Sequence, residues 1–103
     1  MAQNVRNDSL TVGTSVVQVS QNMTGGTNHR VGINLRNSST GGQTISLAFS
    51  DNQQAVANSG IVLAAGQNIA DFDSEGYIAW QGNITAIASA AGATLSIYER
   101  TGA

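Results

Sequence analysis

Three acidic residues stand at alternate positions in the segment DFDSEG, and carboxylates with this spacing can bind a hard cation. Asp71, Asp73 and Glu75 are followed by Gly76, as in the first half of an EF-hand calcium loop. The twelfth position, where a glutamate should close the site, is Gly82, and the flanking segments have the pattern of strands. An EF-hand is therefore rejected. A looser cation site and a solvated acidic turn both stay open, and the turn is favoured.

Nucleophilic catalysis needs a serine or cysteine beside a base and an orienting acid. His29 is the only histidine and stands in a polar segment beside Arg30, and no serine lies in a G-x-S-x-G motif. The glycine pairs at 25–26 and 41–42 are followed by neither a lysine nor a helical pattern, so they predict turns and not phosphate-binding loops. The sequence predicts a protein that is not an enzyme and that has no cofactor or dedicated metal site.

Aromatic side chains are the remaining candidates for binding. Tyr77 and Trp80 flank Ile78 in a short segment that has the character of a strand. If Ile78 points to the core, both aromatic side chains point outward, where they could stack on a sugar ring or pack in a subunit interface. In the opposite register they lie in the core. The core position is favoured because the chain has few large side chains to fill it.

Composition excludes several classes of partner. The chain has 103 residues, a net charge of −2, four arginines, no lysine and no cysteine, and only 10% of its residues are charged. A nucleic-acid-binding protein needs several cationic contacts with phosphate, so nucleic acid is not an expected partner. No apolar run approaches the length of a membrane span, and residues 1–9 are polar, unlike a signal peptide. We therefore expect no membrane association, and synthesis in the cytoplasm.

Apolar residues recur at every second position in several short segments, which is the period of a half-buried strand. In the last quarter of the chain, Ile84, Ala86 and Ala88 share one face of a strand, and Leu95 and Ile97 share a face of the next. The small residues between them, including Gly92, predict a hairpin turn. Segments 30–37 and 43–50 predict a second hairpin. The expected strands are 10–12, 15–20, 30–37, 43–50, 61–63, 68–72, 84–89 and 93–100, and segment 77–80 leads into the last two of them.

About eight short strands with turns every 8 to 12 residues are typical of an antiparallel β-sandwich of the jelly-roll type. In the strand 30–37 we expect Val31, Ile33 and Leu35 on the core face. In the strand 43–50 we expect Ile45, Leu47 and Phe49 on the core face. Residues 1–9 have no periodicity, so the sequence predicts a flexible polar N-terminal arm over 1–9 and a single β-sandwich domain over 10–103. The arm could be a frayed terminus or could order on a neighbouring subunit.

Four segments resemble small structural proteins of tailed-bacteriophage particles: LTVGTSVVQVS, RVGINLRNSSTGGQTISLAFS, SGIVLAAGQNIADF and NITAIASAAGATLSIYER. The resemblance covers about Leu10 to Arg100. It implies a jelly-roll-like sandwich that decorates the outer surface of an icosahedral capsid. The implied partner is the major capsid protein, and the implied state is a homo-oligomer, a dimer or a trimer, that bridges neighbouring capsid subunits. A tail or head-fibre subunit and a carbohydrate-binding module are the alternatives.

Two sets of contacts accompany this hypothesis. The polar arm would lie on the capsid by strand addition or amide hydrogen bonding, through Ala2, Gln3, Asn4, Val5 and Arg6. Contacts between subunits would come from three aromatic residues, Tyr77, Trp80 and Tyr98.

Overall fold

The structure, a computed structural model, describes residues 3–24 and 28–102 and confirms the all-β fold class. Eight strands form two four-stranded antiparallel sheets, and the molecule measures 41 × 26 × 21 Å. The strands are β1 (Gln3–Val12), β2 (Val17–Ser20), β3 (His29–Asn37), β4 (Ile45–Phe49), β5 (Ile61–Leu63), β6 (Asn68–Phe72), β7 (Ile84–Ala88) and β8 (Ala93–Gly102).

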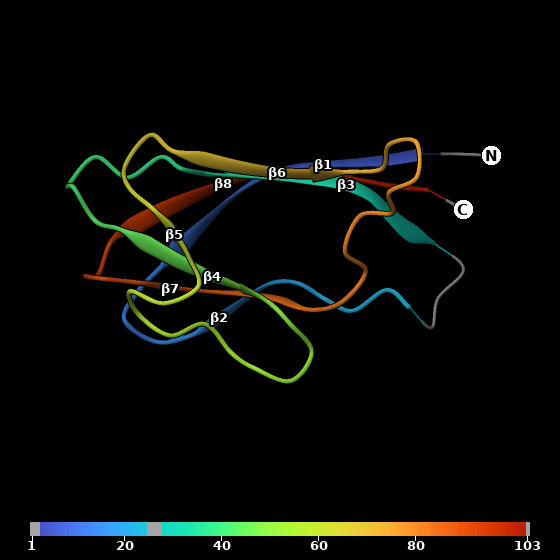
Figure 1. Cartoon of the computed structure of the whole chain (residues 1–103). Helices are drawn as coiled ribbons and strands as arrows, with labels where there is room; N and C mark the ends of the chain where they lie inside the picture. The colour runs from blue at the N-terminus through green and yellow to red at the C-terminus, as the bar shows by residue number, and fades with distance from the viewer. Residues whose placement is uncertain (1–2, 25–27, 103) are drawn as a thin grey trace.

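Strand pairing follows a nested order. β1 pairs with β8, β2 with β7, β3 with β6 and β4 with β5, so the chain resembles one long hairpin wound into two layers. Sheet A has the order β1-β8-β3-β6 and sheet B the order β2-β7-β4-β5. Figure 1 shows sheet A as the upper layer and sheet B as the lower layer. This eight-stranded, double-sheet arrangement is a jelly roll.

The two expected hairpins are wrong, because their strands lie in different sheets. β7 pairs with β2 and β4, whereas β8 pairs with β1 and β3. β3 and β4 are likewise separated, and the buried Asn37 fastens the crossing between them by donating to the carbonyls of Gln43 (2.8 Å) and Leu63 (2.9 Å). Alternation identifies a strand but not its partner, and a turn of small residues can cross between sheets. Gly92 does adopt the expected positive φ, at 82°.

The core lies between the sheets and is lined by the alternate residues of each strand. The expected inward positions in β4, β7 and β8 are buried, and Phe49 at the end of β4 is half-buried. The buried apolar residues that pack together are Val12, Val19, Ile33, Leu35, Ile45, Leu47, Leu63, Ile84, Ala86, Ala88, Ala93, Leu95 and Ile97.

A bulge in β3 changes which residues of that strand face inward. The register between β3 and β8 shifts between Arg30 and Gly32, so Val31 is the extra residue. Ile33 and Leu35 are fully buried as expected, but Val31 is only half-buried and Arg30 is fully buried in its place. The sequence pattern assumed an unbroken strand, and a single extra residue reverses the alternation on one side of it.

The buried Arg30 guanidinium is surrounded by acceptors from both sheets. Its Nε donates to the Glu99 carboxylate of β8 at 2.8 Å, and the Ser20 hydroxyl of β2 donates to the same carboxylate at 2.6 Å. A guanidinium carries five N–H groups and cannot lose its charge in a protein, so burial requires that all five be bonded. The remaining donors reach the carbonyls of Trp80, Gly82 and Gln21 and the hydroxyl of Ser20.

Gln81 bonds the backbone of Arg30 and so completes the Arg30 cluster, which consists of Arg30 and the groups bonded to it. The Arg30 backbone N–H donates to the Gln81 side-chain carbonyl at 2.7 Å, and the Gln81 amide donates back to the Arg30 carbonyl at 2.6 Å. These bonds hold segment 79–83 against the end of the sandwich. The segment is not part of a sheet, so the strand character predicted for 77–80 is wrong apart from a single bridge between Ser74 and Tyr77.

Burial alone would raise the pKa of the Glu99 carboxyl, but the hydrogen bonds from Ser20, Arg30 and Arg6 and the Arg30 charge outweigh it. The net pKa of Glu99 lies below its ordinary value of 4.5. Because the pKa is lower in the folded chain than in the unfolded one, ionised Glu99 stabilises the fold fully above the unfolded value. That contribution is lost as the pH falls through the folded pKa.

Replacing Glu99 with glutamine should lower the free energy of unfolding at pH 7 by roughly 3–5 kcal/mol, because Arg30 would stay buried without its counter-charge. Urea unfolding followed by Trp80 fluorescence measures this loss. Since glutamine does not titrate, Glu99→Gln should also lose less stability than the native chain on acidification below about pH 4.5. The matched control, Glu75→Gln in an exposed loop, should change stability by about 0.5 kcal/mol or less. Equal effects of the two substitutions would contradict this role for Glu99.

Candidate interaction surfaces

The segment expected to be a flexible arm is the first part of β1. Residues 3–9 pair with Ser96–Gly102 of β8, and the expected domain boundary between residues 9 and 10 falls inside this strand. β8 is ten residues long and supplies backbone partners along its whole length. An edge strand with two wet faces needs no apolar alternation, which is why the sequence pattern missed it. Met1 and Ala2 lie outside the described residues.

β1 forms one edge of sheet A, so its outer backbone groups face away from β8. Of the residues proposed for capsid contact, Asn4 and Val5 are exposed, and 51% of Val5 is accessible to solvent. Gln3 begins the strand. The structure thus presents four of the five proposed contact residues, Gln3 to Arg6, as part of a preformed strand.

Arg6 differs from its neighbours because its side chain is engaged within the fold. Its Nη1 donates to the Val19 carbonyl at 2.9 Å and lies 3.4 Å from the Glu99 carboxylate, and its Nη2 lies 3.3 Å from the Asp8 carboxylate. Arg6 therefore ties edge strand β1 to β2 and to the buried Arg30 cluster. It is poorly placed for a contact outside the molecule.

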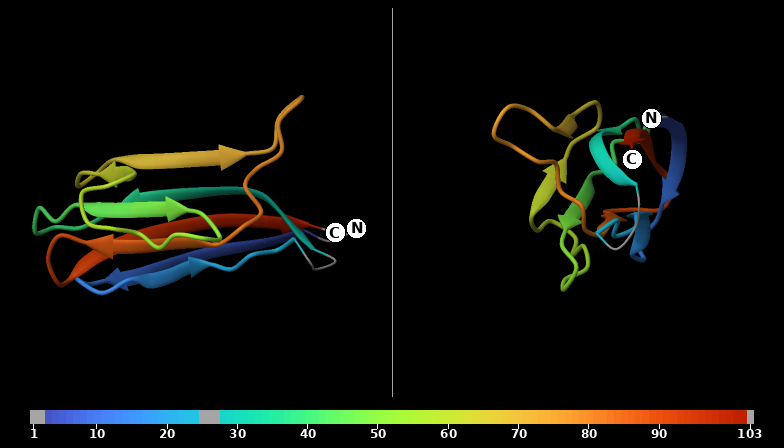
Figure 2. Two further views of the ribbon diagram at one scale, coloured as in Figure 1. Left: turned by 60° about the horizontal axis from the view of Figure 1, so that its bottom comes forward. Right: turned by 90° about the vertical axis from the view of Figure 1, so that its right-hand side faces the viewer.

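The acidic motif has a structural use in the loop that follows β6. The Asp71 carboxylate accepts the Trp80 backbone N–H at 2.8 Å and the Tyr77 hydroxyl, and Asp73 accepts the Ala79 N–H at 2.7 Å. These bonds shape the loop at 73–79, which projects from the sandwich in Figure 2. Among residues 3–24 and 28–102, no group of three His, Cys, Asp or Glu side chains is placed to hold a metal ion.

The three aromatic residues proposed as subunit contacts lie in different surroundings. Trp80 is half-buried, packs against the core and donates its indole N–H to the Asn83 carbonyl at 2.9 Å. Tyr77 is 50% exposed, so the favoured core position is wrong for this residue. The neighbouring Ile78 is 74% exposed and does not point to the core. Tyr98 lies on β8, on the outer face of sheet A.

A cluster of side chains on the outer face of sheet A was not predicted from the sequence. Phe72 of β6 and Tyr98 of β8 are stacked with their ring centroids 6.3 Å apart, and the Arg100 guanidinium lies 6.0 Å from the Tyr98 ring centroid. Gly32 of β3 lies between these strands, paired with both Phe72 and Arg100. Gly32 is the one feature of the sequence that could have indicated this cluster, since a glycine inside a regular strand often marks a place where another group lies close to the backbone.

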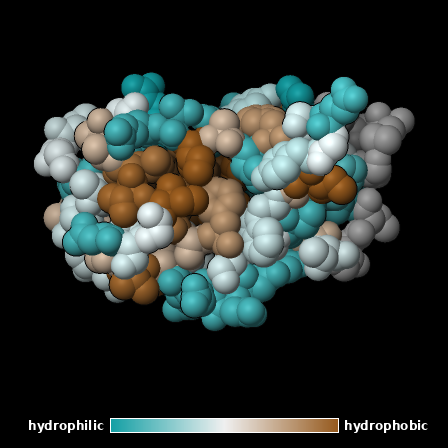
Figure 3. All heavy atoms as spheres, viewed as in Figure 1, coloured by the Kyte–Doolittle hydropathy of each residue, from teal (hydrophilic) through white to brown (hydrophobic). Residues whose placement is uncertain are grey.

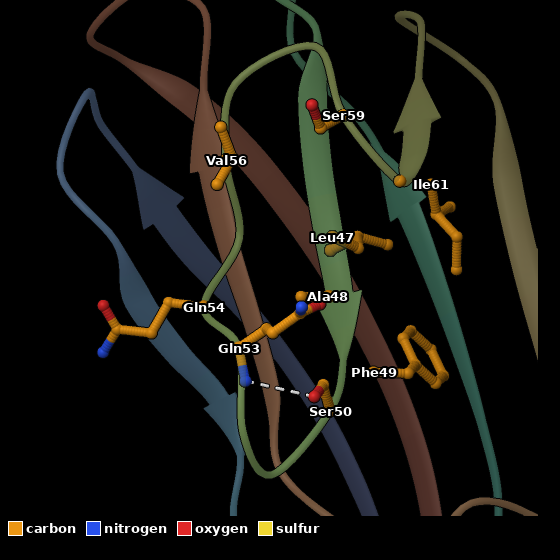
Figure 4. A pocket seen from close by; sticks show the side chains of 10 residues that line it. Leu47, Ala48, Phe49, Ser50, Gln53, Gln54, Val56, Ser59 and Ile61 are labelled. Atoms are coloured by element: carbon orange, nitrogen blue, oxygen red, sulfur yellow. Dashed lines mark hydrogen bonds between the residues drawn. The ribbon is translucent and has the colours of Figure 1, made fainter.

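Apolar side chains also gather where the edge strands β5 and β6 meet, on the side of the molecule drawn in Figure 3. Phe49, Ile61 and Ile69 are half-buried there and pack against the core. Next to them, the loop at 50–60 and the end of β4 enclose a pocket of about 310 Å³ (Figure 4). All residues that line it are uncharged: Leu47, Ala48, Phe49, Ser50, Gln53, Gln54, Val56, Ser59, Gly60 and Ile61.

The pocket exists because β5 is short. β5 pairs with β4 only at Ile45, Ser46 and Leu47, so the partner strand ends before β4 does. The loop at 50–60, between β4 and β5, is held over the outer face of sheet B by two hydrogen bonds. The Asn58 N–H donates to the Ser46 hydroxyl and the Ala55 N–H donates to the Thr85 hydroxyl, both at 2.9 Å. Such a pocket suits a small uncharged group and offers no acid or base for catalysis.

No helix in the described part of the chain is long and apolar enough to span a membrane.

Comparison with known proteins adds a likeness of fold. No family model matches the sequence, and no curated protein matches it. One solved structure has a similar fold, and it is described under the words "Bacillus endospore appendages form a novel family of disulfide-linked pili". The similarity covers 97% of this chain and 83% of the chain in that structure. The TM-score is 0.58 and the sequence identity 17%. At this identity the likeness shows a shared fold, the double-sheet β-sandwich.

Proposed function

We propose that this protein is a non-enzymatic structural subunit that is present in many copies on a larger assembly and contacts its neighbours through edge strand β1. The observation that carries the proposal is the preformed, ten-residue β1, with its outer backbone edge unpaired among the described strands. An exposed strand edge is a general means of joining one chain to another by backbone hydrogen bonds.

The favoured assembly is the head of a tailed bacteriophage, with this chain as a capsid decoration protein. Its support is the sequence resemblance over about Leu10 to Arg100 and the compact jelly roll that such a role needs. In this role a dimer or trimer binds the major capsid protein on the outer surface of the shell. A ligand that binds only the assembled shell stabilises it by mass action, without any chemistry.

A second candidate, a subunit of a fibre or pilus, is favoured by the likeness to the endospore pilus protein. That protein is described as forming disulfide-linked pili. The present chain has no cysteine, so a fibre built from it would be held together by strand pairing and side-chain packing alone.

Copy number separates these two candidates. In purified phage particles whose genome encodes the chain, quantitative mass spectrometry should find hundreds of copies in a simple ratio to the major shell protein. A few copies per particle would indicate a fibre or tail part. Absence from the particle, combined with filaments of the purified chain in electron micrographs, would overturn the capsid role and support the pilus-like one.

Substituting Val5 with lysine tests the role of β1. A lysine on an edge strand opposes strand addition, so Val5→Lys should weaken binding to undecorated shells at least fivefold, about 1 kcal/mol. Co-sedimentation with the shells measures the affinity. Val56→Lys is the matched control, because Val56 is similarly exposed (61%) but lies in the loop over sheet B. If the two variants bind equally well, β1 is not the contact.

A further inference from the structure

We propose that the outer face of sheet A is a binding platform for an acidic polysaccharide, with sugar rings stacked on Phe72 and Tyr98 and carboxylates paired with Arg36 and Arg100. These four residues project from the same face of three adjacent strands, β6, β3 and β8. The site lies apart from the pocket beside β4, and Val5 of edge strand β1 borders it as the cross-strand neighbour of Arg100.

The Phe72 ring lies against Gly32, where β3 has no side chain. A Cβ atom placed on Gly32 would lie 1.8 Å from Phe72 Cδ2 and 2.4 Å from Cε2. The ring therefore occupies the space that any other residue at position 32 would fill, and Phe72 stays half-exposed on this face. A flat aromatic face is the surface on which the apolar side of a sugar ring packs.

Tyr98 and Arg100 extend this flat area across β8. The Tyr98 ring is inclined by 30° to that of Phe72, and the Arg100 Nη2 donates to the Tyr98 hydroxyl at 3.0 Å. The hydrogen bond and the stacking hold both side chains in place before a ligand arrives. Preorganised side chains lose little conformational entropy on binding, which favours affinity.

Charge is distributed unevenly over the molecule. The protein has a net charge of −2, yet the outward positions of the described strands of sheet A carry two arginines, Arg36 and Arg100, and no carboxylate. Neither arginine forms a salt bridge within the described residues, whereas Arg6 and Arg30 both pair with Glu99. A guanidinium binds carboxylate in a planar, two-bond geometry, so this face is complementary to a carboxylate-bearing ligand.

Two amide side chains lie near Arg36, Asn34 between Gly32 and Arg36 on β3 and Asn68 paired with Arg36 on β6. Asn68 donates to the Asn34 side-chain carbonyl at 2.7 Å, which uses one end of each amide and leaves the other end of each to bond a hydroxyl. Arg100 pairs with Gly32, four residues from Arg36 along β3, so the two arginines are separated by roughly 13 Å along the strand. This length suits several sugar units of a chain and not a single sugar.

Other anionic polymers fit the platform less well. Nucleic acid carries a phosphate on every nucleotide and binds through many cationic contacts, and the platform has two. An acidic peptide would pair with both arginines but would make no use of the aromatic rings of Phe72 and Tyr98. A chain of uronic acid units supplies carboxylates, hydroxyls and apolar ring faces together.

Calorimetric titration of the full chain with oligogalacturonate should detect binding that weakens with added salt. Fully methyl-esterified oligogalacturonate retains the rings without the charges, and polyglutamate retains the charges without the rings. Both should bind at least tenfold more weakly. Equal binding of polyglutamate, or no binding of oligogalacturonate, alginate or hyaluronate, would overturn the proposal.

Two substitutions locate the site. Arg36→Gln removes an exposed charge that the fold does not use, and it should weaken oligogalacturonate binding about tenfold. Gln53→Glu changes the net charge by the same amount in the exposed loop over sheet B and should leave binding unchanged. Phe72→Ala should weaken binding severalfold, with Tyr77→Ala as the aromatic control outside the platform. Equal losses in Arg36→Gln and Gln53→Glu would show that only net charge matters and would exclude the platform.

Discussion

The fully buried guanidinium of Arg30 is the constraint on which the surrounding structure depends. A charge that cannot be neutralised must be bonded on every side when it is removed from water. Arg30 meets this requirement with Glu99 of β8, Ser20 of β2 and carbonyls of two connecting segments, so it joins both sheets at one end of the sandwich. It also determines the course of segment 79–83, which closes that end, and through Glu99 it reaches Arg6 of β1.

The nested strand order determines where the molecule can meet a partner. The first strand pairs with the last, the second with the second last, and so on inward. As a result, β1 and β2 are the edge strands on one side of the sandwich, and β5 and β6 are the edge strands on the other. β1 is long and polar, while β5 is only three residues long and leaves a pocket beside β4. Strand addition would use the outer backbone edge of β1, whereas ligand binding would use side chains on the outer face of sheet A, and the two surfaces meet where Val5 lies beside Arg100.

The candidate surfaces could be predicted only in part. Residues 1–9 were singled out as a polar N-terminal segment, and Asn4 and Val5 are exposed, but no local pattern could reveal that residues 3–9 form a strand, because their backbone partners lie near residue 100. Tyr98 was noted as an aromatic residue available for contact. Its stacking with Phe72 across Gly32 depends on the pairing of β3 with β6 and β8, which the sequence does not specify.

By itself the sequence determined the class of fold and most of the strands, because a period of two and frequent turn residues are local properties of the chain. It also determined the apolar core positions in β4, β7 and β8. Only the tertiary structure decided the pairing, since residues such as Asn37 and Arg30 make bonds to segments far away in the chain. The bulge at Val31 is the clearest case. One additional residue moved an arginine into the core, and the buried Glu99 carboxylate supplies the counter-charge that this position needs.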